Sequence, residues 1–197
     1  MTHWKSTIEN EVFWYGLGKS WEPETIRIWK ILCIHANTIL DIGANTGIYS
    51  LIAKTLNPAS SVYAFEPSDL IFYKLEKNNQ LNKYDIQLIN KGVSNITGEL
   101  VFYDVEDYHQ TSASLEADKL KNMEGFTGKI REYKIPTLRI DDFMSEQRLT
   151  KIDLVKIDVE LHEPQVLEGF GKYLTLCKPI IIVEILTLEV AEKIHSL

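Results

Sequence analysis

The amino-acid sequence predicts an α/β fold, with a mostly parallel central sheet flanked by helices. In the first half of the chain, short apolar segments alternate with segments of helical character, and the connections between them are short. In the second half, two segments have the nearly unbroken hydrophobicity of strands that are covered on both faces. A length of 197 residues suits one such domain, so we expect residues 1–197 to form a single domain.

The elements of the first half follow in a regular order. Residues 1–35 predict an N-terminal helical segment, and Pro23 suits the first turn of a helix over 23–34. Strands and helices then alternate, with expected ranges of 38–42, 46–56, 61–66, 67–81 and 85–90. This β-α-β-α-β order is typical of parallel strands joined by right-handed crossovers.

The pattern changes after the third strand. Residues 99–140 predict an inserted β-hairpin, whose strands over 99–105 and 129–140 flank a long polar loop. The parallel order then resumes before a fourth parallel strand. The remaining expected elements are a strand over 152–159, a helix over 164–174, a strand over 179–186 and a short helix over 187–197.

Composition excludes several classes of protein. The formal net charge of −7 disfavours binding to nucleic acid, whose phosphates would be repelled. The N-terminal residues lack the apolar core of a signal peptide, and no apolar run approaches membrane-spanning length. Cys33 and Cys177 lie far apart in apolar surroundings, which predicts free thiols. We therefore expect a cytoplasmic protein that binds neither nucleic acid nor membrane.

A glycine-spaced loop joins the first predicted strand to its helix, and its residues are candidates for cofactor binding. Two glycines alone would also fit a tight turn without a ligand, but this position places helix N–H groups beside the loop. A dinucleotide site favours G-x-G-x-x-G, whereas here the spacing is G-x-x-x-G and a carboxylate precedes it. S-adenosylmethionine carries an ammonium and a sulfonium instead of phosphates, so an acid suits it. The candidates are Asp41, Gly43, Ala44, Asn45 and Gly47.

Four further positions are candidates for contacts to the nucleoside. Glu66 ends the second predicted strand, where a carboxylate can accept both ribose hydroxyls, and Pro67 follows it. This placement serves NAD and S-adenosylmethionine alike, and an acid at a helix start is the alternative interpretation. Asn90 and Gly92 follow the third strand, where the edge of an adenine would lie.

These segments together resemble a known family. The stretches "ILDIGANTGIYSL", "VYAFEPS", "TLRIDDF" and "DLVKIDVELHEPQVLEG" are similar to those of FkbM-type S-adenosylmethionine-dependent methyltransferases, over roughly residues 38–186. The resemblance implies a Rossmann-like class I methyltransferase fold, with the cofactor bound where the strands end. It also implies methylation of an oxygen on a sugar, a natural product or a similar small acceptor.

The sequence departs from the family pattern at two places. Leu161 stands where family members usually have glycine, which would strain the turn if the backbone has a positive φ there. The sequence after the fifth parallel strand leaves little room for the antiparallel strand pair that usually completes such sheets. We therefore expect an incomplete sheet edge, through which copies of the chain could associate as a homo-oligomer.

The segment "KIDVELHE" supplies the catalytic candidates. Asp158 is expected to face both the methionine end of the cofactor and the acceptor, with Glu160 on the same side of the chain. His162 is the candidate base because its ordinary pKa lies near 6.5, although a surface position at a helix start is an equal alternative. The acids here lack a spacing diagnostic of a metal site. Further candidates for acceptor contacts are Glu163, Ser112, Ser114 and Glu184.

The resulting hypothesis is S-adenosylmethionine-dependent methyl transfer to a hydroxyl of a small molecule. The alternative is a catalytically weak or inactive S-adenosylmethionine-binding protein that acts through a partner, suggested by Leu161 and the expected sheet edge. A nucleotide-dependent oxidoreductase is a third hypothesis. Fold alone does not choose among them.

Overall fold

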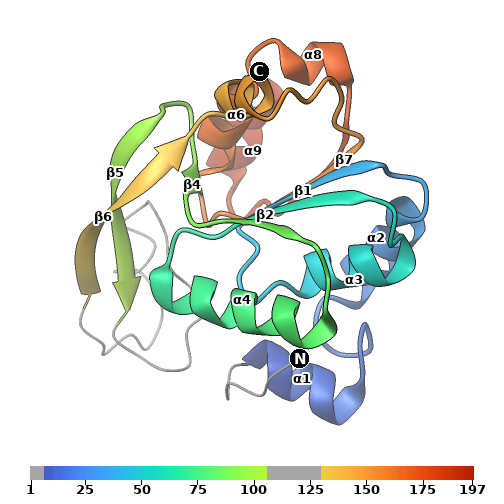
Figure 1. Cartoon of the computed structure of the whole chain (residues 1–197). Coiled ribbons are helices and arrows are strands. Elements are labelled where there is room, and N and C mark those ends of the chain that lie inside the picture. The colour runs from blue at the N-terminus through green and yellow to red at the C-terminus, as the bar shows by residue number, and fades with distance from the viewer. Residues whose placement is uncertain (1–6, 106–129) are drawn as a thin grey trace.

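A computed structural model describes residues 7–105 and 130–197 and confirms the α/β fold, with helices on both faces of a five-stranded parallel sheet (Figure 1). The strands lie in the order β3-β2-β1-β7-β8, and every neighbouring pair is parallel. They are β1 (Thr38–Ile42), β2 (Ser61–Phe65), β3 (Gln87–Ile89), β7 (Leu154–Ile157) and β8 (Ile180–Val183).

Helices cover both faces of this sheet (Figure 1). One face carries α2 (Pro23–Cys33), α3 (Ile48–Leu56) and α4 (Asp69–Asn82), with α1 (Thr7–Tyr15) lying outside them. The other face carries α6 (Ile140–Glu146), α7 (Glu163–Gly169), α8 (Tyr173–Cys177) and α9 (Leu188–His195). No helix in the described part of the chain has both the length and the apolar character needed to cross a membrane.

The central strands are buried on both sides. In β1, Ile39 packs into the cluster beneath α2 and α3, whereas Leu40 and Ile42 pack into the cluster beneath α6 and α7. Successive side chains of a strand point to opposite faces, so a strand covered on both sides is apolar at most positions, and Asp41 in β1 and Lys156 in β7 are buried exceptions. This explains why the strand segments read as continuous apolar runs rather than as alternating ones.

The predicted hairpin forms a second, three-stranded sheet beside the first (Figure 1). Here β5 (Gly98–Val105) pairs antiparallel with β6 (Ile130–Leu138), as the sequence predicts. The short strand β4 (Gly92–Val93) pairs parallel with the end of β6 and was not predicted. Because β4 follows β3 directly, it links the two sheets.

The structure corrects several element boundaries. The predicted helix over 164–174 is two helices, because Gly171 has a φ of +51° and interrupts it. Helix α3 begins two residues later than predicted, after Gly47 with a φ of +91°. Helix α6 was missed, since its seven residues are too short to show a clear period.

Strand β8 is the last strand of the parallel sheet, with β7 as its only strand neighbour among the described residues. The side chain of Ile180 on this strand is 53% exposed.

Candidate active site

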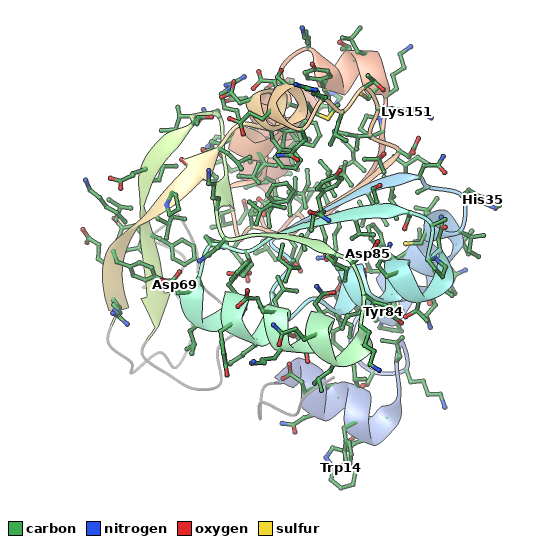
Figure 2. The ribbon with its side chains drawn as sticks, viewed as in Figure 1. Trp14, His35, Asp69, Tyr84, Asp85 and Lys151 are labelled. Atoms are coloured by element: carbon green, nitrogen blue, oxygen red, sulfur yellow. The ribbon has the colours of Figure 1, made fainter. Side chains whose placement is uncertain are left out.

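A pocket of about 260 Å³ opens at the C-terminal ends of the parallel strands. Figure 2 labels Asp69 near these C-terminal ends, and it labels His35, Asp85 and Lys151 on the opposite side of the sheet, where the strands begin. The pocket walls come from the segments that follow β1, β2, β3, β7 and β8, together with residues of α1, α3 and the segment before α2. Ligands of open α/β sheets characteristically bind at the C-terminal ends of the strands.

The glycine loop after β1 forms one wall of the pocket. The N–H groups of Gly43 and Ala44 both donate to the carbonyl oxygen of Phe65, at 3.0 and 2.9 Å. Gly43 has a φ of +79°, and a Cβ there would overlap the carbonyl oxygen of Asp158. Glycine is therefore required at this position both by the backbone conformation and by the close approach of the segment after β7.

Glu66 holds this loop to the end of β2. The side chain is buried, and its two carboxylate oxygens accept from the N–H of Asn45 at 3.0 Å and from the N–H of Ser68 at 2.9 Å. Glu66 and the adjoining Pro67 both line the pocket. The carboxylate thus has a fixed position in the wall, as a site for a ribose would require.

Asp41 lies behind the pocket wall rather than on it. Its carboxylate is fully buried and accepts from the N–H of Ser50 at 3.0 Å and from its hydroxyl at 2.6 Å. Burial raises the pKa of Asp41, while the ammonium of Lys156 and the bonds from Ser50 oppose that rise. The prediction that Asp41 touches the cofactor is not supported by this position, because the carboxylate anchors α3 to β1.

Lys156 and Asp158 form an ion pair at the end of β7. The distance from Nζ to Oδ2 is 2.7 Å, and the side chains are 5% and 23% exposed. Burial disfavours the charge on Lys156, but Asp158 and Asp41 outweigh that cost and raise the pKa of the lysine. Its Nζ also lies 4.3 Å from the centroid of the Tyr49 ring, within the range of a cation–π contact.

Two more acids face the same part of the pocket. The hydroxyl of Tyr49 donates to the carboxylate of Glu22, and burial together with this bond raises the pKa of the tyrosine. Glu184 follows β8 and lies beside Asp158. One lysine therefore faces three carboxylates here, which leaves an excess of negative charge. Among the described residues, no group of three or more His, Cys, Asp or Glu side chains could hold a metal ion.

The turn after β7 is fixed from behind. Glu160 and Leu161 both have positive φ, of 59° and 80°. The Oε1 atom of Glu163 accepts from the N–H of Leu161 at 3.2 Å and from that of Val159 at 3.4 Å. The side chain of Glu163 is fully buried, and burial raises its pKa.

His162 is not at the pocket wall. It is 6% exposed, and its Nε2 lies 3.0 Å from the hydroxyl oxygen of Ser94. This hydrogen bond joins the turn after β7 to the segment after β4. The prediction that His162 is the base is therefore not supported, because its ring is engaged away from the pocket.

The predicted site residues fall into three groups. Nine line the pocket: Gly43, Ala44, Asn45, Glu66, Pro67, Gly92, Asp158, Glu160 and Glu184. Five lie elsewhere: Asp41, Gly47, Asn90, His162 and Glu163. Ser112 and Ser114 lie outside the described residues.

Two of the five depart from their expected roles for clear reasons. Asn90 donates to Oδ1 of Asp69 at 2.6 Å, which ties the end of β3 to the start of α4. Gly47 has its positive φ at the start of α3, where a Cβ would overlap Leu75. Both residues thus shape the wall without forming it.

Sequence reasoning missed several pocket residues that come from distant segments. Ile8 of α1, Glu22 before α2 and Phe102 of β5 all line the pocket, and none carries a local motif. Trp21 also lines the pocket, and it was not missed, because the cluster of aromatic residues before the helix over 23–34 indicates an aromatic wall there. Trp14 does not, since it is 73% exposed and points away from the body of the protein (Figure 2).

Comparisons with known proteins find methyltransferases among the relatives of this chain. The 31-O-demethyl-FK506 methyltransferase FkbM of Streptomyces tacrolimicus is 27% identical over 154 residues, covering 68% of this chain and 59% of that protein. The 2-O-methyltransferase NoeI of Sinorhizobium fredii is 29% identical over 154 residues, covering 70% of this chain and 58% of that protein. The chain thus spans less than two thirds of the length of the curated relatives that it matches.

A solved structure confirms the fold. A putative caffeoyl-CoA O-methyltransferase from Staphylococcus aureus superimposes with a TM-score of 0.51 at 12% identity, covering 98% of this chain and 79% of that one. At such low identity the likeness concerns the fold alone. The sequence model of the methyltransferase FkbM domain matches residues 41–194, which include the glycine loop, Glu66 and the turn after β7. By this match over most of its length, the chain belongs to the FkbM methyltransferase family.

Proposed function

We propose that the pocket binds S-adenosylmethionine and that the chain transfers its methyl group to a hydroxyl of a small molecule. One observation carries the proposal. A single pocket is walled by the glycine loop and Glu66 on the β2 side and by Glu22, Asp158 and Glu184 on the β7–β8 side. A nucleoside and a cationic group within one ligand match these two sides.

The residues present fit each part of this cofactor. The carboxylate of Glu66 suits two vicinal ribose hydroxyls, since a carboxylate accepts several hydrogen bonds. Phe65, Ile71 and Val93 supply apolar surface for a base on the same side. The acids on the other side attract the ammonium and the sulfonium, and no phosphate has to approach them.

The cofactor would supply a methyl group on a good leaving group, so the chain has to supply position and a proton acceptor. Orientation of the reactants is worth roughly 7–11 kcal/mol of barrier in favourable cases. Backbone N–H groups of the glycine loop and of the turn after β7 donate hydrogen bonds to the buried carboxylates of Glu66 and Glu163, so the walls are set in advance.

A hydroxyl acceptor is supported by the names of two relatives. One acts on an O-demethyl compound and the other is a 2-O-methyltransferase. Among the described lining residues, five are acidic and two are lysines: Glu22, Glu66, Asp158, Glu160, Glu184, Lys91 and Lys156. We propose a neutral or cationic small molecule as the acceptor, because a strongly anionic one would be repelled.

Leu161 favours a second candidate, an S-adenosylmethionine-binding protein with weak turnover. Its φ of 80° is one that glycine adopts readily and leucine does not. The turn after β7 that carries it also carries Glu160 into the pocket. If radiolabelled methyl transfer to a panel of sugars and polyols is absent in the wild type and appears in Leu161→Gly, the weak binder is the correct reading.

The test of cofactor binding is calorimetric titration with S-adenosylhomocysteine. We expect micromolar binding, which corresponds to about −8 kcal/mol, and a loss of at least tenfold in Glu66→Ala. Glu146→Ala, at an exposed end of α6, is the matched control and should bind as the wild type does. Binding of NADH together with no response to S-adenosylhomocysteine would instead indicate an oxidoreductase.

A further inference from the structure

Asp158 and Glu184 occupy adjacent positions at the ends of neighbouring strands. The register pairs Ile157 with Val183, and the N–H of Glu184 donates to the carbonyl oxygen of Ile157 at 3.0 Å. Asp158 follows Ile157 and Glu184 follows Val183, so the two acids lie side by side at the ends of β7 and β8. Their carboxyl groups are in hydrogen-bonding contact, and both line the pocket.

Two carboxyl groups in contact share a proton, because full ionisation of both would place like charges side by side. Lys156 determines which of the two is charged, since its ammonium lies 2.7 Å from Oδ2 of Asp158. Partial burial and the hydrogen bond with Asp158 raise the pKa of Glu184 to about 7. The proton is thus shared by the pair, with the ionised form favoured at Asp158.

Titratable groups from the segment before α2, from α3, from β1 and from β7 surround this pair. Glu22, before α2, raises the pKa of Glu184, and Lys156 of β7 lowers it. Asp41 lies behind Lys156 on β1, and the hydroxyl of Tyr49 on α3 donates to Glu22. Negative charge remains in excess here, so a cation entering the pocket is attracted and favours loss of the shared proton.

We infer that the Asp158–Glu184 pair holds one proton in the cofactor-free protein, releases it when the cationic cofactor binds, and then accepts the proton of the acceptor hydroxyl. This inference rests on the proposed function and adds the residues that serve as its base. It replaces His162, which is bound to Ser94.

The electrons and atoms of the step balance within these groups. The proton of the acceptor hydroxyl passes to a carboxylate oxygen of the pair, and the acceptor oxygen keeps the electrons of that bond. The same oxygen forms the new bond to the methyl carbon, while the electrons of the broken carbon–sulfur bond go to sulfur. Exposure of Glu184 to solvent then allows the proton to leave to water.

The test compares proton release on binding of two ligands that differ by one methyl group and one positive charge. S-adenosylmethionine and S-adenosylhomocysteine are titrated by calorimetry at about pH 6.5, where the pair is mostly protonated, in two buffers of different ionisation enthalpy. We expect S-adenosylmethionine to release more protons than S-adenosylhomocysteine. In Glu184→Gln we expect weaker binding of S-adenosylmethionine, and at ligand concentrations that saturate the site the difference in proton release between the two ligands should vanish.

Glu192→Gln, on an exposed position of α9, is the matched control and should keep the difference. An infrared pH titration of the wild type gives a second readout that needs no variant, since a protonated carboxyl band should disappear when S-adenosylmethionine is added. Equal proton release by both ligands, or an unchanged difference in Glu184→Gln, would overturn the inference alone. Failure of both ligands to bind the wild type would overturn the proposed function, and the inference with it.

Discussion

The N–H of Leu161 donates to Oε1 of Glu163 at 3.2 Å while the backbone of Leu161 has a φ of 80°. A buried carboxylate therefore holds in place a turn whose backbone conformation is unfavourable for the residue that occupies it. Glu160, the residue before, also has a positive φ and lines the pocket. The strain lies where the pocket wall is shaped, which is where strained backbone is commonly retained.

The first prediction concerns this strain. Leu161→Gly and Leu161→Ala remove nearly the same side chain, but only glycine adopts a φ of 80° without cost. A protein with glycine at a given position is usually less stable than one with alanine there. At position 161 we expect the reverse, with the unfolding free energy of Leu161→Gly about 1 kcal/mol higher than that of Leu161→Ala. Urea unfolding of the two variants measures the difference. An alanine variant as stable as the glycine variant would show that the turn is not strained.

The second prediction concerns the contact between the glycine loop and the segment after β7. In Gly43→Ala the new Cβ would overlap the carbonyl oxygen of Asp158, so one segment must move. We expect binding of S-adenosylhomocysteine to be lost, with destabilisation of about 2–4 kcal/mol. Gly98→Ala is the control, since a Cβ at Gly98 meets nothing within 4 Å and stability should change little.

The third prediction compares two lysine–aspartate pairs at opposite ends of β7. Lys151 lies 2.6 Å from Asp153 and is 66% exposed, whereas Lys156 lies 2.7 Å from Asp158 and is 5% exposed. Removing one member of a buried pair leaves an uncompensated charge, so Lys156→Met should cost about 3–5 kcal/mol. Lys151→Met should cost about 1 kcal/mol or less. Similar losses of unfolding free energy in the two variants would contradict the assigned difference in burial.

The fourth prediction concerns pH. Burial raises the pKa of Glu163 above its ordinary value of 4.5, so the folded state binds a proton more tightly than the unfolded state does. Its contribution to stability is therefore present at low pH and is lost as the pH rises through the folded pKa. Glu163→Gln keeps an acceptor oxygen but cannot ionise.

Relative to the wild type, Glu163→Gln should gain stability as the pH rises above 4.5, at up to about 1.4 kcal/mol per pH unit. Urea unfolding of both proteins across acidic to neutral pH measures this slope. If the difference in unfolding free energy between the two proteins does not change with pH, the pKa of Glu163 is the same in the folded and unfolded states.

The sequence was sufficient for the parallel sheet because each strand is signalled locally. Residues 38–42 form a strand with the predicted bounds, and Gly43 has the conformation that its position indicates. Glu66 is where the end of the second strand places it, in the pocket wall. These features depend on neighbouring residues and on rules for parallel strands, so no distant contact was needed to find them.

Other features depend on contacts between distant segments and could not be read locally. His162 has the ordinary pKa of a base, yet Ser94, which lies 68 residues away, determines where its ring is held. Glu22 and Ile8 reach the pocket only because α1 and the segment before α2 pack near the strand ends. Lys156 pairs with Asp158, two residues further along the chain, but its contact with Tyr49 follows from how α3 crosses the sheet.

The position of β8 has a consequence for the lifetime of the acid pair. Among the described residues this strand has a neighbour on one side only, and Glu184 follows directly after it. The outermost strand of a sheet opens more readily than the inner ones, and its amide protons exchange sooner. Each opening of β8 would carry Glu184 away from Asp158. The rate at which this strand opens would therefore set the rate at which the two carboxyl groups separate.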